Sequence, residues 1–131
     1  MSISVQIVTP ERPIYSGTCS EVRAPSALGE IGVMPGHRAL LAALDAGRVL
    51  VQAGNGDDIF AVSGGFIEVS DDTVTILAEH AIAASEIDLA SARASLGDAQ
   101  DALRGLGPND ADYPAMVAKA DWSRAQLLAK S

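Results

Sequence analysis

Few residues of this chain have the types and spacing that chemistry requires, and its two histidines are the first candidates. His37 follows a Pro-Gly pair and precedes Arg38, whereas His80 follows Glu79 at the end of a predicted strand. Neither histidine has a metal-ligand spacing or lies beside a serine or cysteine in a nucleophile motif. The sequence therefore predicts no catalytic residue, and His80 is interpreted as a surface residue.

Phosphate, metal and thiol chemistry are equally poorly supported. Gly64-Gly65 is not part of a GxxxxGK[ST] or GxGxxG motif, so a structural turn is the preferred interpretation. Two pairs of aspartates lack the ligand alternation of a calcium loop and are interpreted as solvated turn residues: Asp57-Asp58 and Asp71-Asp72. Cys19 lies in a predicted strand and is expected to be a small core residue rather than a reactive thiol. We predict no metal site and no cofactor.

Composition limits the partners. The chain has 131 residues, enough for one domain or a small domain with an appendage, and a net charge of -8. Because binding to phosphate backbones needs a basic surface, we expect no nucleic-acid partner. No apolar run reaches the roughly 20 residues that span a bilayer, so no direct membrane insertion is expected. The N-terminus lacks the pattern of an export signal, and the single cysteine fits a reducing compartment.

Residues 29–44 are the segment that generic patterning explains least well. Three glycines and Pro35 fall within eight residues and require tight turns, while apolar neighbours hold the segment against a core. His37 and Arg38 follow the Pro-Gly turn, and the apolar run 40–44 is expected to return to the interior. We interpret the segment as a rigid contact surface whose shape carries its function.

The elements that position these residues are predicted as strands up to residue 84. Two extended pieces, 14–16 and 18–24, flank Gly17, which is interpreted as a bulge or bend. Asn55-Gly56 is a strong hairpin signal because both residues tolerate positive φ. The other predicted strands are 3–9, 48–53, 58–63, 66–70 and 73–79. Turn signals every eight to twelve residues favour an antiparallel β-sandwich over residues 1–84.

Residues 85–131 are predicted to form an antiparallel two-helix hairpin. Ser85 and Asp88 resemble a capping box that would begin the first helix, and residues 105–108 contain the glycines and proline that would end it. Each helix has one apolar stripe at helical spacing: Leu89, Ala92, Leu96, Ala99 and Leu103, then Tyr113, Met116, Ala120, Ser123 and Leu127. Because two helices alone bury little apolar surface, the hairpin is expected to pack against the sandwich or against a partner. Trp122 lies off its stripe, either covering the sandwich or serving as an interface anchor.

Several motifs, in this order and spacing, resemble the epsilon subunit of bacterial F-type ATP synthases, the counterpart of the mitochondrial delta subunit. The resemblance extends over nearly the whole chain. It is carried by Gly29-Glu30-Ile31-Gly32-Val33-Met34-Pro35-Gly36-His37 with Leu40-Leu41, Gly47, Ser63-Gly64-Gly65-Phe66-Ile67-Glu68-Val69, Val74-Thr75-Ile76-Leu77-Ala78 and Glu86-Ile87-Asp88.

The resemblance implies a non-catalytic rotor subunit in the central stalk of a proton-translocating ATP synthase, which couples rotation of the c ring to ATP synthesis. In that family the sandwich binds the gamma subunit and the c ring, and ring contact is carried over to Glu30, Gly36, His37 and Arg38. The implied location is peripheral, on the cytoplasmic face of the bacterial plasma (inner) membrane, with attachment through the ring.

For the hairpin, the resemblance implies a regulatory element that reaches the alpha and beta subunits and weakly inhibits ATP hydrolysis. Some members bind ATP through an Ile-Asp-x-x-Arg-Ala segment. Here the segment is degenerate, with Ser91 at the arginine position among Ile87, Asp88, Ser91 and Ala92. Arg93 lies about 200° further around the helix, so it does not replace that arginine. We therefore expect no bound ATP.

Two alternatives from other classes remain. A free-standing β-sandwich that binds protein partners would have the same composition, but it would not require the motifs at 29–44 and 63–69 together. A small nucleotide-sensing regulator is the other alternative, which titration with Mg-ATP would test. The sequence does not determine whether the hairpin is folded against the sandwich or extended.

Overall fold

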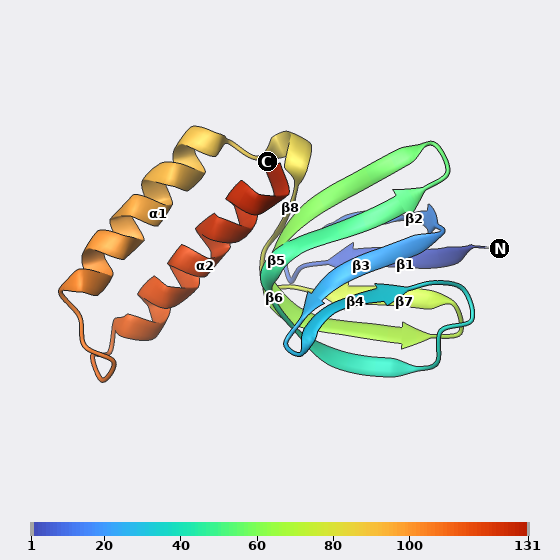
Figure 1. The fold of residues 1–131 in the computed structure, drawn as a ribbon, viewed down its shortest axis with the longest axis horizontal. Helices are drawn as coiled ribbons and strands as arrows, with labels where there is room; N and C mark the ends of the chain where they lie inside the picture. Colours follow the sequence, from blue (N-terminus) through green and yellow to red (C-terminus); the bar gives the residue numbers. More distant parts are fainter. Residues whose placement is uncertain (1, 131) are drawn as a thin grey trace.

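The computed structural model describes residues 2–130, which form a β-sandwich with a helical hairpin against one end (Figure 1). Eight strands come first: β1 (Ile3–Val8), β2 (Pro13–Cys19), β3 (Glu21–Ser26), β4 (Gly29–Val33), β5 (Leu40–Ala53), β6 (Gly56–Ser70), β7 (Thr73–Leu77) and β8 (Ala81–Ala83). A short 3-10 turn, η1 (Ala84–Glu86), leads to the helices α1 (Leu89–Arg104) and α2 (Tyr113–Lys130). The predicted order of sandwich followed by hairpin is confirmed.

The sandwich is one sheet folded over on itself. Its strand order is β2-β1-β7-β6-β5-β3-β4, with β8 also paired to β6. The long strands β5 and β6 pair along nearly their whole length, while β7 pairs with residues 66–70 of β6 and β8 with residues 60–62. Opposite halves of β6 therefore carry different neighbours as the sheet curls into two layers (Figure 1). Every pair is antiparallel except β1 and β7, which are parallel.

The core between the layers consists mainly of β-branched side chains, which strand alternation directs inwards. Along β1, for example, Ile3, Val5 and Ile7 are buried while the residues between them face outwards. The other strands bury eleven further large side chains of the core: Val22, Val33, Leu44, Val49, Val51, Phe60, Val62, Ile67, Val69, Val74 and Ile76. Because this surface is continuous, the sandwich has a core of its own.

The predicted turn at Gly64-Gly65 is wrong, because β6 runs through the pair. Gly65 has φ +122, a conformation that side chains rarely tolerate, and a Cβ atom there would lie 1.9 Å from the Leu77 carbonyl oxygen. The two glycines therefore bend the strand where the neighbouring backbone approaches, so that β6 passes from one layer to the other without leaving the sheet.

The predicted division of residues 14–24 at Gly17 is also wrong. β2 continues through Gly17, which pairs with Val5 of β1, and the chain leaves the strand only at Ser20. A Cβ atom on Gly17 would lie 2.9 Å from the Tyr15 hydroxyl, so the glycine leaves room for that ring. Packing of a neighbouring aromatic side chain, rather than a bend, explains the glycine.

The first helix begins later than predicted, because Asp88 and not Ser85 is its N-cap. The Asp88 carboxylate accepts a hydrogen bond from the Ser91 backbone N–H at 3.1 Å, and helical backbone begins at Leu89. Before it, Ile87 is extended and buried against the sandwich. Burial of Ile87 holds the chain extended to that point, so the cap falls on the next residue.

The two helices pack side by side, and only α2 lies against the sandwich (Figure 1). Both predicted stripes are inward or half-buried, with Ala92, Ala99, Ala120 and Ser123 fully buried. Trp122 packs against the cluster formed by Ala61, Ile87, Ala125 and Ala129. Of the two roles left open for Trp122, covering the sandwich is the one observed. Neither described helix combines the length and hydropathy needed to cross a bilayer.

Candidate docking surfaces

The loop of residues 34–39 joins β4 to β5 at the end of the sandwich away from the helices (Figure 1). A turn closed by the His37 N–H and the Met34 carbonyl, 3.1 Å apart, opens the loop. Gly36 has φ +85 and donates its N–H to the Asp72 carboxylate at 2.8 Å. The loop is therefore tied to the β6–β7 turn and holds a defined shape.

His37 and Arg38 extend from this loop. The His37 Nδ1–H donates to the Arg38 carbonyl oxygen at 2.7 Å, because a carbonyl can only accept. This hydrogen bond leaves Nε2 for a partner, as an acceptor in the neutral ring. Arg38 is exposed and His37 half-buried, so both are available for contact.

Glu30 lies elsewhere. It sits near the start of β4, opposite Pro25, and its carboxylate is 3.4 Å from the guanidinium of Arg23. Since a strand rises about 3.3 Å per residue, Glu30 lies roughly 10 Å from Val33, where the loop begins. The structure brings Gly36, His37 and Arg38 together and leaves Glu30 at the other end of the same edge strand.

An apolar row crosses the outer face of the sheet. Four side chains are directly paired across β5, β6, β7 and β1: Ala43, Phe66, Leu77 and Val8. Phe66 is 55% exposed and Leu77 50% exposed, and Leu41 beside the row is 70% exposed. The run 40–44 thus returns only alternate residues to the interior, because a strand has two faces. Exposed apolar side chains gathered in this way are typical of a protein interface.

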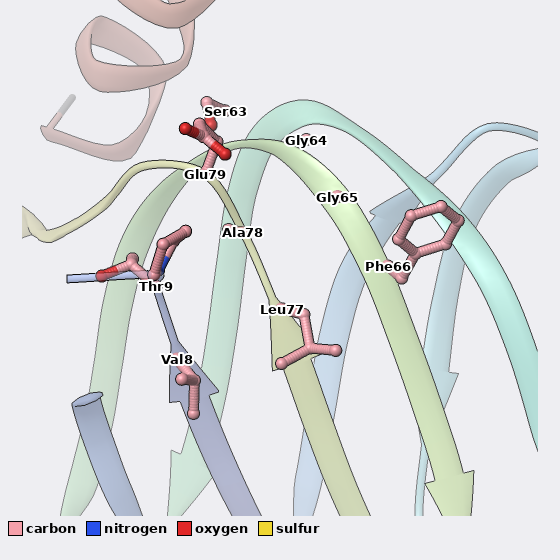
Figure 2. Close-up of a pocket in the computed structure, with 10 residues that line it drawn as sticks. Val8, Thr9, Ser63, Gly64, Gly65, Phe66, Leu77, Ala78 and Glu79 are labelled. Carbon is pink, nitrogen blue, oxygen red and sulfur yellow. The ribbon is translucent and has the colours of Figure 1, made fainter. Parts of the chain in front are cut away.

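A groove of about 410 Å³ continues this row towards the hairpin (Figure 2). Phe66 and Leu77 lie at one end, the backbone of Gly64 and Gly65 runs between, and Ser63 and Glu79 lie at the other end near the helices. The groove is open and mostly apolar, so it suits a protein side chain or helix edge better than a small charged ligand.

The residues of the degenerate ATP segment have structural roles. Ile87 and Ala92 are buried, Asp88 caps α1, and the Ser91 backbone supplies the N–H that Asp88 accepts. Only Ser91 has an exposed side chain that the helix does not use in its cap. The arrangement explains three of the four residues without a nucleotide.

The ionisable groups of β2 belong to the core rather than to a reactive site. Cys19 is buried in the sandwich core, which confirms its interpretation as a core residue, and this burial raises the pKa of its thiol. Burial is also the main cause that raises the pKa of Tyr15, and the neighbouring Asp58 carboxylate adds to it. Within residues 2–130, no three His, Cys, Asp or Glu side chains gather as a metal site would require.

The sequence interpretation did not identify two features of these surfaces: the exposed pair Phe66 and Leu77, and the contact made by Asp72. The exposed Phe66 and Leu77 follow from alternation, since burial of Ile67 and Ile76 forces their neighbours outwards. The role of Asp72 has no such signal in the sequence. A carboxylate in a turn is normally interpreted as solvated, and its hydrogen bond with the Gly36 N–H joins segments that are distant in the sequence.

These features define a class: a protein-binding subunit with a rigid β-sandwich, an apolar face and an accessory helical hairpin. The chain belongs to the family of ATP synthase delta/epsilon chains, because residues 2–84 match the ATP synthase Delta/Epsilon chain beta-sandwich domain. It is similar to the ATP synthase epsilon chain of Geobacter metallireducens, 41% identical over 98% of this chain and 95% of the relative. The corresponding values for an Anaeromyxobacter relative are 37%, 97% and 96%. Members of this family are non-catalytic subunits of the membrane-associated ATP synthase.

Solved structures share the fold. A chain of the Euglena gracilis mitochondrial ATP synthase OSCP/F1/c-ring structure aligns with a TM-score of 0.80 at 23% identity, covering 95% of this chain and 78% of that chain. A chain of the Tetrahymena thermophila mitochondrial ATP synthase central stalk/c-ring structure aligns with a TM-score of 0.63 at 20% identity, covering 100% of this chain and 98% of that chain. These likenesses extend the shared fold beyond the sandwich to the hairpin.

Proposed function

We propose that this chain is a rotor subunit of the central stalk that joins the gamma subunit to the c ring, on the cytoplasmic face of a bacterial plasma membrane. Two regions divide the work. Residues 1–84 bind both rotor partners, and residues 85–131 form a regulatory hairpin that reaches the alpha and beta subunits. The observation that carries the proposal is the exposed apolar row across four strands of an otherwise acidic chain.

The gamma subunit occupies the apolar row and the groove beside it. Phe66 and Leu77 are directly paired, each half-exposed, and together form the centre of the face. Since each side chain is already about half-buried, completing its burial contributes roughly 1 kcal/mol, about half of the value for full burial. Central aromatic and aliphatic side chains of this kind carry most of the affinity of protein interfaces.

The c ring contacts the 34–39 loop. Gly36, His37 and Arg38 lie at the end of the sandwich that is farthest from the helices (Figure 1). A rigid turn that presents a histidine and an arginine suits polar loops of a ring. Glu30, near the far end of β4, is assigned a peripheral ring contact, since its carboxylate is already paired with Arg23.

A gamma-binding measurement tests the role of the apolar row. Replacing Phe66 and Leu77 together by serine is expected to weaken binding of the cognate gamma subunit at least about tenfold, because two apolar anchors are lost. The matched control is Leu28→Ser, which removes a fully exposed apolar side chain from the β3–β4 turn, outside the row. Equal gamma affinity for the double variant and the wild type, by calorimetry, would refute the assignment.

A further inference from the structure

Asp72 connects three segments at the end of the sandwich where the 34–39 loop lies. Asp71 and Asp72 form the turn between β6 and β7, with φ of +50 and +57. The Asp72 carboxylate accepts the Gly36 N–H at 2.8 Å, and its backbone carbonyl accepts the Ser4 N–H at 2.9 Å. One residue thus ties the loop to β1 and to the β6–β7 turn.

This contact differs from the other hydrogen bonds near the loop. Those of His37 are local, to the Met34 and Arg38 carbonyls. The Gly36 hydrogen bond spans 36 positions of sequence and has a carboxylate as its acceptor. Hydrogen bonds to ionised acceptors are stronger than those between neutral groups. The bond therefore ties the middle of the loop to a distant segment, whereas the hydrogen bonds of His37 act only within the loop.

We propose that Asp72 is a positioning residue for docking on the c ring: its carboxylate holds Gly36 so that His37 and Arg38 are pre-oriented before contact. The inference rests on the proposed contact between this loop and the ring. A loop that is already ordered loses little conformational entropy on binding. By restraining the loop, Asp72 therefore raises its affinity for the ring, although Asp72 itself does not contact the ring.

The turn geometry gives Asp72 a fixed starting point. Its left-handed backbone is common for aspartate, asparagine and glycine in turns, and the Ser4 hydrogen bond anchors its carbonyl. Asp71 has nearly the same backbone and the same charge, but no hydrogen bond of its carboxylate reaches the loop in the described residues. The adjacent aspartate is therefore a matched control.

Three variants of the full chain separate the roles. Asp72→Gly keeps the positive φ and removes the acceptor, Asp72→Asn keeps an oxygen acceptor without the charge, and Asp71→Gly removes one charge from the same turn. A fourth variant, His37→Ala, removes the proposed ring contact itself. Each variant is measured by amide hydrogen exchange, by binding to the cognate gamma subunit, and by binding to a detergent-purified complex of gamma and c ring.

We expect Asp72→Gly to exchange the Gly36 amide roughly tenfold faster, to bind gamma alone within twofold of wild type, and to bind the gamma–ring complex roughly fivefold more weakly. Asp72→Asn is expected to lie between Asp72→Gly and wild type, and Asp71→Gly to match wild type in all three measurements. Rescue by asparagine would separate positioning through the hydrogen bond from an effect of net charge.

The possible failures are distinguishable. If Asp72→Gly frees the Gly36 amide but leaves ring binding unchanged while His37→Ala weakens it, the ring contact stands and the positioning role is wrong. If His37→Ala also leaves ring binding unchanged, the loop is not a ring contact and both proposals fall. If Asp71→Gly weakens ring binding as much as Asp72→Gly does, charge rather than position explains the effect, and the inference is overturned.

Discussion

The core of the sandwich and the contact between the hairpin and the sandwich are built from different side chains. The sandwich core contains large β-branched residues from both layers. The hairpin contact is centred on Ala61, Ile87, Ala125 and Ala129, with the half-buried Ala46, Ile59, Ile82 and Trp122 packed against them. The first is a continuous interior of fully buried large side chains, whereas the second is a smaller cluster in which three of the four fully buried residues are alanines.

The difference predicts two levels of stability. A buried methylene contributes about 0.8 kcal/mol, so an alanine contributes far less than the valines and isoleucines of the sandwich. Undocking the hairpin should therefore cost less free energy than unfolding the sandwich.

Gly65→Ala should destabilise the sandwich by roughly 3 to 4 kcal/mol, because φ +122 disfavours a side chain and its Cβ would collide with the Leu77 carbonyl. Urea unfolding followed by far-UV circular dichroism measures the change. An effect under about 1 kcal/mol would mean that the bend in β6 can relax. The sandwich would then not be markedly more resistant to change than the contact with the hairpin.

Trp122→Ala should weaken hairpin docking by about 1 to 2 kcal/mol, because Trp122 covers the alanine cluster and its ring lies 5.9 Å from that of His80. Amide exchange in α2 would become faster by about five- to thirtyfold, with strand amides unchanged. Arg124→Ala, which breaks only an exposed ion pair on the same helix, is the control. Equal acceleration in the strands would show that sandwich and hairpin unfold as one unit.

Gly97→Ala should stabilise α1 by about 0.5 to 1 kcal/mol, because glycine is a poor helix former and a Cβ atom there meets nothing within 4 Å. The change in stability is thus expected to be negative at Gly65, where packing requires a glycine, and positive at Gly97, where it does not. A loss of helix stability, seen as faster exchange of α1 amides, would contradict this.

The sandwich should also lose stability in alkali, through β2. Burial raises the folded pKa of Cys19 and Tyr15 above their usual values of about 9 and about 10, so the folded state keeps protons that the unfolded chain releases. Their contribution is complete below pH 9 and is lost as the pH rises through the folded values. Tyr15→Phe should flatten the fall above about pH 10 in urea unfolding, and an unchanged slope would exclude Tyr15 as a cause.

Sequence and structure agree best where one segment explains its own conformation. Alternation in β1 predicts its buried face, and the two apolar stripes predict the facing sides of the helices, because strand and helix periodicity are local. The errors share the opposite cause. From the sequence, Gly65 is predicted to lie in a turn, but in the structure the Leu77 backbone packs against it. Gly17 is likewise predicted to be a bend, but the Tyr15 ring occupies the space beside it.

The sequence predicted strands followed by two helices and an acidic chain, and it singled out residues 29–44 as an unusual segment without predicting the strands at 29–33 and 40–47. The folded chain sets how the parts of that segment are placed. It groups Gly36, His37 and Arg38, separates them from Glu30 by the length of β4, and brings Asp72 to the Gly36 amide. Local periodicity fixes which face a side chain occupies, whereas contacts between distant turns depend on how the curled sheet brings those turns together.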